Sequence, residues 1–455
     1  MKMIHLVLIV IITIIGLGAA YGFGFPLFAG FSFGLAALVT AALRRRLVGP
    51  RKLLRIMADG VGHTKEVMWI LLLVGLLIPA WTASGAIAFL VDSGLKWLHP
   101  EWIVSFGFVF SSVISLTLGT STGTLSAVGI PLMGVASVLG VPLPVMAGAL
   151  VSGAFVGDRT SPFSSAHQLV ALSTGVPERS LFRILLPTTA MAYGAALICF
   201  VMADWLGDWG AGVDAAPVVG TVGSGLAMSP WLAVPPVLLL VSIVLRIRTR
   251  YAFLLGIASS LVIGGWLQGG TVTEWLGWLW GGYEAAGDAG VSQVKGVAGM
   301  VDLVLLIALA GAYNGIMEET GMIRPLVRRL LGERASLTGA TVRTGLFGLG
   351  LGLVSCTQTL PIMMTGRNLL DEWTARFRRE HLARVTADTS LLLAALVPWN
   401  MLAILCGTIL GVSVEQYVPY ALFVWLPPLL TVAWSAWRTS RGGAAAVLEV
   451  QGRET

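Results

Sequence analysis

Apolar residues occur in runs that are long enough to cross a lipid bilayer. The runs recur from the amino terminus to about residue 436, and short polar segments separate them. A helix of about 20 apolar residues spans the ~30 Å hydrocarbon core of a membrane. No polar segment has the length of a soluble domain. The pattern therefore predicts an all-α membrane protein with about 10 transmembrane helices.

Composition and charge agree with this prediction. Hydrophobic residues make up 56% of the 455 residues, charged residues only 11%, and the mean hydropathy is +0.85. A soluble domain has about 25% charged residues. The 29 Lys and Arg residues outnumber the 23 acidic residues, but they form short clusters between apolar runs. That is the pattern of cytoplasmic loops, so nucleic acid is not an expected partner.

The basic clusters also predict how the chain is oriented in the plasma (inner) membrane. Six basic residues lie between Arg44 and Arg55, directly after the second apolar run. The positive-inside rule places this cluster and both chain termini in the cytoplasm. The first run resembles a signal peptide, but another apolar run follows closely, which favours a retained first span. Contacts with anionic lipids are compatible with the basic loops.

Two of the apolar runs are interrupted by residues that carry hydroxyl groups. The sequence GTSTGT, here called the first tip (residues 119–124), interrupts the run 103–139. The sequence CTQTLP, here called the second tip (residues 356–361), interrupts the run 344–370, which has basic residues on both sides. Two full spans need about 35–40 residues, and the second run is shorter than that. The second run is therefore predicted to form a re-entrant hairpin, and the first run, which is interrupted midway in the same manner, is predicted to form a second one.

The two halves of the chain repeat the same elements in the same order. The motifs WTASG and MEETG end spans at residues 85 and 321, and 321 − 85 = 236. The tips are also 236 residues apart (357 − 121), and Asp158 and Asp388 are 230 apart. Loop charges give the corresponding elements opposite directions, which predicts an inverted repeat, typical of secondary transporters. The predicted segments are an amino-terminal part (1–65), a first repeat (66–206), linking helices with an external Trp-rich segment (207–300), a second repeat (301–437) and a disordered cytoplasmic tail (438–455).

Asp158 and Asp388 are the strongest candidates for function. A carboxylate in the bilayer core costs about 2.5–3.5 kcal/mol, so it is kept where partners or water receive it. Each lies beside hydroxyl-bearing residues at a predicted helix break, where hydroxyls, carbonyls and the carboxylate can bind a hard cation. A desolvated carboxyl group can also exchange a proton for that cation. Both are therefore predicted transient Na⁺ ligands, with structural ion pairs to Arg159 and Arg384 as the alternative.

Further polar residues near the tips and breaks are predicted to bind the ion or substrate. They are Thr120, Ser121, Thr122, Thr160, Ser161, Thr357, Gln358, Thr359, Thr389 and Asn400. The alternative for any one of them is a role in helix packing. Arg159 is a candidate for holding a substrate carboxylate. His167 is a candidate proton relay, or else a hydrogen-bonded packing residue.

An enzyme is not predicted. The first tip contains G-x-S-x-G, but Ser121 interrupts a membrane run and does not follow a strand of a soluble sheet. An intramembrane serine protease would need His167 as its base, and an aspartyl protease would need motifs that are missing around Asp158 and Asp388. The three cysteines lie apart without C-x-x-C spacing, so neither a disulfide framework nor a zinc site is indicated, and no cofactor is expected.

At these residues the chain resembles the NhaC family of sodium/proton antiporters, within the ion-transporter superfamily. The matching stretches are GTSTGT, PLPVMAGALVSGAFVGDRTSP, CTQTLPIMMTG, ADTS and VPWN, and they cover most of the chain from about residue 66 to 436. The resemblance implies a carrier that exchanges Na⁺ for protons. It also allows a relative that moves an organic acid or amino acid with the same ions, as in the malate/lactate antiporter branch. An elevator-like movement of the hairpin domain is what the superfamily implies.

The chain departs from the family pattern at two places. The family motif commonly continues with Ser-Asp-Thr, whereas this chain has Ser164, Ser165 and Ala166. The tip commonly reads G-T-S-W-G-T, and Thr122 replaces the aromatic residue. Both changes lie where the substrate is expected, so they bear on which solute is carried. The external Trp-rich segment is a further candidate, as a homodimer interface.

Overall fold

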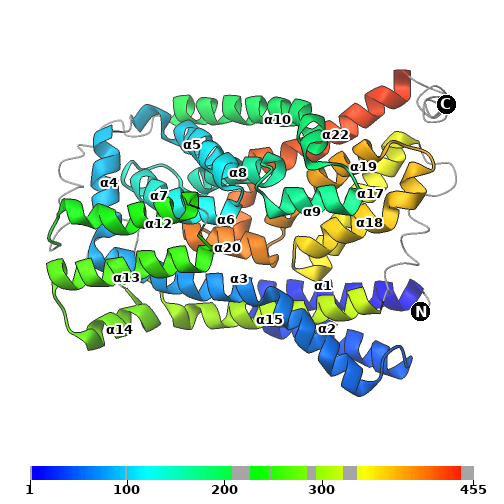
Figure 1. Cartoon of the computed structure of the whole chain (residues 1–455), viewed down its shortest axis with the longest axis horizontal. Coiled ribbons are helices and arrows are strands. Elements are labelled where there is room, and N and C mark those ends of the chain that lie inside the picture. Colours follow the sequence, from blue (N-terminus) through cyan, green and yellow to red (C-terminus); the bar gives the residue numbers. More distant parts are fainter. Residues whose placement is uncertain are drawn as a thin grey trace.

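The computed structural model describes residues 3–97, 100–207, 226–245, 247–283, 294–320 and 336–441, and these residues are almost entirely helical. Seven described helices are long and apolar enough to span a membrane, or up to nine if each bent pair counts as one span. The prediction of a helical, multi-pass membrane protein is therefore confirmed. The longest helices run along the long axis of the molecule, and the start of α1 and the end of α22 lie at the same end of it (Figure 1).

One group of helices lies along the lower side of Figure 1. It consists of α1 (Met3–Gly22), α2 (Leu27–Arg44), α3 (Pro50–Ser84), α12 (Val234–Val244), α13 (Thr249–Gln268), α14 (Val272–Gly281) and α15 (Val301–Glu319), with the short elements η3 (Pro230–Ala233), β1 (Gly282–Tyr283), β2 (Val294–Lys295) and η4 (Val297–Met300). Glycines let its helices approach closely. A Cβ atom on Gly60 of α3 would lie 2.3 Å from the carbonyl oxygen of Gly311 of α15. Such small-residue contacts are common between transmembrane helices.

The second group contains the candidate site and lies above the first in Figure 1. Its first half consists of α4 (Ala86–Trp97), η1 (Pro100–Trp102), α5 (Ile103–Leu118), α6 (Ser121–Thr124), the π-helix η2 (Leu125–Gly129), α7 (Ile130–Val138), α8 (Leu143–Thr160), α9 (Ser165–Thr174) and α10 (Glu178–Gly207). Its second half consists of α17 (Leu337–Ser355), α18 (Thr359–Thr374), α19 (Arg379–Thr386), the π-helix η5 (Ala387–Leu391), η6 (Leu393–Leu396), α20 (Met401–Leu410), α21 (Val414–Tyr417), η7 (Val418–Tyr420) and α22 (Leu422–Arg441).

The two halves share an order of elements. In each half, a helix ends at a break, a second helix follows, and the next crossing is itself broken. In the first half, α5 is capped by Gly119 and the chain resumes as the continuous helix α6–η2–α7 before α8. In the second half, α17 is capped by Cys356, and α18 is followed by the crossing that breaks before Asn400. Pro398 accounts for that break, because a proline disfavours helical backbone at the residue before it. The re-entrant character of the hairpins and the inversion of the repeats stay predictions.

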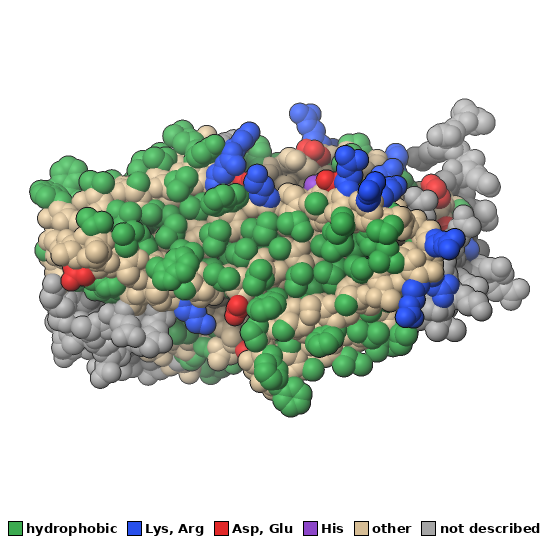
Figure 2. All heavy atoms as spheres, turned by 90° about the horizontal axis from the view of Figure 1, so that it is seen from below, with side chains coloured by type: hydrophobic (Ala, Val, Ile, Leu, Met, Phe, Trp, Pro, Cys, Tyr) green, Lys and Arg blue, Asp and Glu red, His purple; other side chains and the backbone are tan. Residues whose placement is uncertain are grey.

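Hydrophobic side chains are spread along the whole face drawn in Figure 2, and Lys and Arg side chains stand mainly along its upper edge and right end. Large apolar residues such as Val262 and Phe33 are 72% and 66% exposed, as expected for side chains that face lipid. Several predicted features lie outside the described residues: most of the external segment after residue 207, part of the Trp-rich segment, the basic loop at 321–335 and the tail after residue 441.

Asp204 near the end of α10 supplies the missing cap of α5. The carboxylate accepts hydrogen bonds from the backbone N–H groups of Val104 at 3.0 Å and Ser105 at 2.8 Å, while Trp102 at the N-cap position provides no side-chain bond. A carboxylate at a helix N-terminus satisfies free N–H groups and matches the helix dipole. The contact therefore ties the start of α5 to α10.

Removing this carboxylate is expected to destabilise the protein. Asp204→Ala should lower the free energy of unfolding by about 1–2 kcal/mol, because buried N–H groups lose their acceptor. Asp204→Asn keeps one acceptor oxygen and should lose less. Thermal unfolding of the detergent-purified variants measures the difference. Equal melting temperatures for Asp204→Ala and the wild type would contradict the capping role.

Candidate functional site

A buried ion pair joins the two halves of the chain. The Nε atom of Arg159 on α8 donates to Oδ1 of Asp388 at 2.6 Å, and Nη2 lies 2.5 Å from the same oxygen. Both side chains are completely buried. Burying two charges is costly unless their remaining donors and acceptors are also satisfied. The other contacts of the pair therefore decide whether it is stable.

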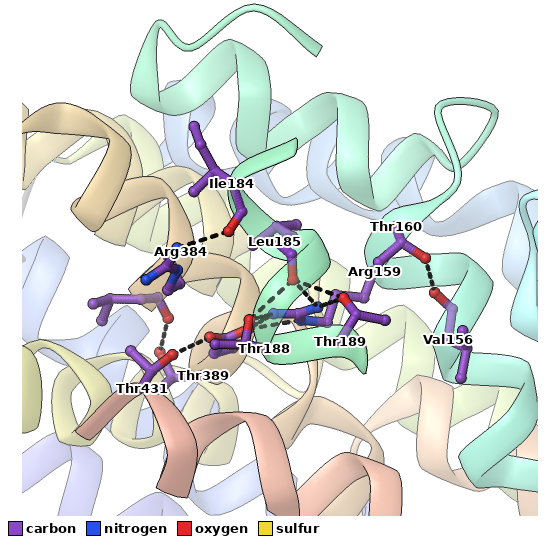
Figure 3. Close-up of polar contacts among 12 residues, drawn as sticks. Val156, Arg159, Thr160, Ile184, Leu185, Thr188, Thr189, Arg384, Thr389 and Thr431 are labelled. Atoms are coloured by element: carbon purple, nitrogen blue, oxygen red, sulfur yellow. Dashed lines mark hydrogen bonds and ion pairs between the residues drawn. The ribbon is translucent and has the colours of Figure 1, made fainter. Parts of the chain in front are cut away.

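These contacts come from α10 and α22. Nη1 of Arg159 donates to the hydroxyl of Thr189 and to the carbonyl oxygen of Leu185, and Nη2 donates to the hydroxyl of Thr188 at 2.7 Å. Figure 3 shows the Arg159 side chain reaching this turn of α10. The guanidinium therefore makes four hydrogen bonds, and its Nη2 atom is also in ion-pair contact with Asp388. The second oxygen of Asp388 accepts a hydrogen bond from the hydroxyl of Thr431 on α22.

The alternative pairing of each aspartate with an arginine nearby in sequence is wrong. Arg159 pairs with Asp388 and not with its neighbour Asp158. Arg384 instead donates to a carbonyl group of α10 at 2.7 Å and places its guanidinium 5.3 Å from the ring centre of Trp434. Consecutive residues of a helix point in different directions, about 100° apart at 3.6 residues per turn. Asp158 and Arg159 therefore face different neighbours.

Asp158 lies in its own polar environment close to the end of α8. Its carboxylate is only 7% exposed. It accepts hydrogen bonds from the hydroxyl and the backbone N–H of Ser121, and from the hydroxyl of Ser164 at 3.3 Å. Ser121 begins the helix α6–η2–α7, and a helix N-terminus favours a negative charge. In the described part of the chain these donors are hydroxyls and an amide, so the charge of Asp158 is not neutralised by a guanidinium as that of Asp388 is.

The first tip is fixed against the loop that follows α8. Gly119 has φ +67°, and a Cβ atom there would lie 2.5 Å from the carbonyl carbon of Phe163. Only glycine combines this backbone conformation with such a close approach. The hydroxyl of Ser161 donates to the carbonyl oxygen of Leu116 at 2.8 Å and so holds the end of α5. These contacts position Ser121 on the carboxylate.

Two further hydroxyls of the first tip lie beside Ser121. The hydroxyl of Thr120 caps α6 by accepting a hydrogen bond from a backbone N–H of that helix at 3.4 Å. It also lies 3.3 Å from the hydroxyl of Thr122. Both threonines are only partly buried. The first tip therefore provides one hydroxyl bonded to Asp158 and two paired hydroxyls at the next positions.

The second tip is held by two amide side chains. The Nδ2 atom of Asn314 on α15 donates to the carbonyl oxygen of Ser355 at 3.0 Å and to the hydroxyl of Thr357 at 3.2 Å. The Nε2 atom of Gln358 donates to the carbonyl oxygen of Leu391 at 2.9 Å. The second tip is thereby tied both to α15 and to the π-helix that carries Asp388.

The remaining predicted ligands are mostly occupied by local backbone contacts. Thr160 and Thr389 donate to the carbonyl oxygens four residues earlier, at 2.5 and 2.6 Å. Asn400 caps α20 through its Oδ1 atom, and Thr359 is exposed. The Nδ1 atom of His167 lies 2.8 Å from the carbonyl oxygen of Arg159, which fits a residue that fixes the end of α8. An ion-binding or relay role for these residues stays a prediction.

Several site residues were not predicted from the sequence. They are Ser164, Thr188, Thr189, Asn314 and Thr431. Adjacent hydroxyls after Pro187, inside the 30-residue apolar helix α10, were the clearest signal available. A lone polar residue in an apolar helix, as in α15 or α22, is a weaker signal, because hydroxyl and amide side chains also serve in packing.

Known proteins resemble this chain over most of its length. The sequence model of the Na⁺/H⁺ antiporter family matches residues 211–437. The Na⁺/H⁺ antiporter NhaC of Alkalihalophilus pseudofirmus is 27% identical over 402 residues, which cover 87% of each chain. NhaC of Bacillus subtilis is 28% identical, covering 82% of this chain and 84% of the relative. The malate-2H⁺/Na⁺-lactate antiporter of Bacillus subtilis is 26% identical, covering 91% of each chain.

The family match contains the second half of the site, including Asp388 and Thr431. The matches to the two NhaC antiporters extend over more than four-fifths of the chain, so they are not confined to one half. These relatives are transporters, which agrees with the prediction that the chain is not an enzyme. The chain belongs to the Na⁺/H⁺ antiporter family.

Proposed function

We propose that this protein is a secondary transporter that exchanges Na⁺ for protons across the membrane. The observation that carries the proposal is the different environment of two buried carboxylates. Asp388 is neutralised by Arg159, whereas Asp158 is bonded only to hydroxyl and amide donors among the described residues. One carboxylate with hydroxyl oxygens around it suits a small hard cation. We assign the transported proton to the second carboxylate, whose protonation releases the positive charge of Arg159.

Asp158 is the cation ligand in this proposal. The hydroxyl oxygens of Ser121 and Ser164, now donors to the carboxylate, can turn their lone pairs toward a bound Na⁺. Thr120 and Thr122 lie at the next positions of the first tip and can add oxygens. The negative charge of Asp158 compensates the charge of the ion, so the loaded site is neutral and can cross the membrane interior.

Asp388 is the proton site, and Arg159 couples it to Asp158. When Asp388 takes up a proton, the guanidinium loses its counter-charge. Arg159 is the residue next to Asp158, so its uncompensated positive charge opposes the binding of Na⁺ there. By linkage, bound Na⁺ opposes the protonation of Asp388 to the same extent. Mutually exclusive binding of the two ions is what an antiporter requires.

An organic acid or amino acid carrier is the second candidate, and the malate-2H⁺/Na⁺-lactate antiporter among the relatives supports it. Such a carrier needs a cationic group for the substrate carboxylate. Arg159 is the buried candidate, but all three nitrogens of its guanidinium already contact Asp388, Thr188, Thr189 or Leu185. The arrangement therefore favours Na⁺/H⁺ exchange.

The proposal also includes how the transport helices move and how the chain is oriented in the membrane. We infer that the two broken crossings and their tips move as a unit against the helices around α3 and α15. The recurring order of elements in the two halves supports an inverted repeat, with each tip forming a re-entrant hairpin. The basic cluster at residues 44–55 supports cytoplasmic termini.

The experiment is a transport assay in everted membrane vesicles that contain a pH-sensitive dye. After the vesicles are energised, Na⁺, Li⁺, K⁺, malate and arginine are added in turn. Na⁺ is expected to dissipate the proton gradient, and malate or arginine alone is not. A response to malate or arginine without any response to Na⁺ would replace the proposal with the second candidate. Vesicles from cells that lack the protein provide the baseline.

A further inference from the structure

Helix α22 carries a row of hydroxyl groups that begins next to Asp388. Thr431, Ser435 and Thr439 are spaced four residues apart, so they lie on one face of the helix. Thr431 bonds to Asp388, and the other two hydroxyls each donate to the carbonyl oxygen one turn earlier, at 2.7 and 2.8 Å. The row leads from the buried carboxylate to the carboxyl-terminal end of α22.

The facing side of α17 carries matching hydroxyls. Thr439 lies 3.0 Å from Thr338 at the exposed end, and Ser435 lies 3.0 Å from Thr341 in the buried part. We call these five residues, Thr338, Thr341, Thr431, Ser435 and Thr439, the hydroxyl seam. Its outer pair reaches the molecular surface, whereas Thr341, Ser435 and Thr431 are at most 1% exposed.

His381 of α19 completes the middle of the hydroxyl seam. Its Nε2 atom lies 3.1 Å from the hydroxyl of Thr341 and 2.9 Å from that of Ser435. Its ring stacks on Trp373 of α18, with ring centres 6.0 Å apart. The charged groups that act on the ring are Arg384 of its own helix and Arg438 of α22. The imidazole therefore bonds to the hydroxyl seam, and the two guanidinium groups that act on it are positively charged.

A row of polar groups inside an apolar helix bundle lowers the stability of the fold unless each group is hydrogen-bonded, so its presence calls for a functional reason. A hydroxyl group that is taken from water into an apolar interior and left unpaired destabilises the fold, whereas Leu or Ala would pack here without that cost. Thr344, one turn beyond Thr341 on α17, is buried and has no hydrogen-bond partner in the described residues. Packing alone does not account for a polar row that runs from the surface to a buried carboxylate.

We propose that the hydroxyl seam and His381 form the proton path between Asp388 and the surface at the carboxyl-terminal end of α22. The inference rests on the proposed function, because it assigns the transported proton to Asp388. The charged Asp388 accepts from Thr431 at one end, and the Thr338–Thr439 pair meets solvent at the other. Successive pairs are about one helical turn, 5.4 Å, apart, a gap that one bridging water spans.

The transfer conserves atoms and charge. A hydronium ion at the outer pair gives up one proton and becomes water. Along the path each oxygen accepts a proton on one side as it releases one on the other. The Nε2 atom of His381 contacts both Thr341 and Ser435, so it takes up the proton from one hydroxyl and passes it to the other, while Nδ1 keeps its own proton. The last O–H bond forms on the Asp388 carboxylate. The reverse sequence releases the proton when Na⁺ binds at Asp158.

The test uses two readouts on the full-length protein. Variants are Ser435→Ala, Thr341→Val, His381→Phe and His381→Gln, the last of which keeps a hydrogen-bonding side chain. The matched control is Ser259→Ala on α13, whose hydroxyl makes the same bond to a carbonyl four residues earlier, at 2.7 Å. Na⁺-driven proton flux in vesicles is measured from pH 6 to 9. Protonation of Asp388 after a pH jump is followed by its infrared C=O band, assigned by its loss in Asp388→Asn.

We expect the Na⁺-driven proton flux and the rate of Asp388 protonation to fall about tenfold or more in Ser435→Ala, Thr341→Val and His381→Phe. Both rates should fall less in His381→Gln and should not change in Ser259→Ala. The effect should grow with pH, because protons become scarce, while Na⁺ binding measured by isotope retention stays unchanged. Unaltered protonation kinetics in these variants, or no titrating band from Asp388 at all, would overturn the path. Slowed protonation in a protein without Na⁺-driven flux would support the path and contradict the proposed function.

Discussion

Asp158→Asn is expected to reduce Na⁺-driven proton flux by about 100-fold or more, equivalent to about 2.8 kcal/mol of lost interaction with the cation. Asparagine keeps the size and one acceptor oxygen of the side chain, so the contacts with Ser121 and Ser164 can persist. Only the negative charge is removed. Without it, Na⁺ has no counter-charge in a region where desolvation is costly. The loss of transport is measured as proton flux in everted vesicles, and the loss of cation affinity is measured as Na⁺ binding to the purified protein.

Asp204→Asn is the matched control, because Asp204 is equally buried but caps α5 and has no place in the proposed site. This variant should keep most of the flux.

The two serines that contact Asp158 should have a smaller effect on Na⁺ affinity than the carboxylate itself. Ser121→Ala and Ser164→Ala should each raise the apparent KM for Na⁺ about tenfold with little change in the maximal rate, since one neutral ligand is lost. Retained Na⁺ binding in Asp158→Asn would place the cation elsewhere.

The sequence was sufficient to predict the two carboxylates and the elements that carry them. Asp158 and Asp388 stand out because charged residues are rare in long apolar runs, and each lies at a predicted helix break. The breaks appear in the structure where α8 ends and where the crossing after α19 becomes a π-helix. Glycine, proline and hydroxyl groups mark such breaks locally, so no tertiary information is needed to find them.

The partners of these carboxylates could not be predicted in the same way. Arg159 and Asp388 are 229 residues apart, and their contact depends on how α8, α10 and η5 pack. Sequence proximity suggested Asp158 as the partner of Arg159 in the ion-pair alternative, but the direction of a side chain on a helix depends on its rotation, which an evenly apolar run does not reveal. The threonines of α10 and α22 were overlooked for the same reason.

Arg159→Met is expected to cost about 3–5 kcal/mol of stability and to abolish transport, because it leaves the Asp388 carboxylate buried without its counter-charge. Methionine fills most of the volume of the arginine stem, so the loss reflects charge more than packing. The matched control is Arg378→Met. Arg378 pairs with Glu380 at 3.4 Å on the surface, and its side chain is 67% exposed, so removing this pair should cost less than about 1 kcal/mol. Thermal unfolding in detergent compares the two variants.

The double variant Arg159→Met, Asp388→Asn separates stability from function. Removing both charges eliminates the unpaired carboxylate, so the double variant should regain more than half of the lost stability. It should still fail to exchange Na⁺ for protons, because the proton site and the charge that couples it to Asp158 are both gone. Na⁺ binding at Asp158 should persist and lose its dependence on pH between 6 and 9. A double variant that regains pH-dependent exchange would show that the Arg159–Asp388 pair is structural and that Asp158 alone binds both ions.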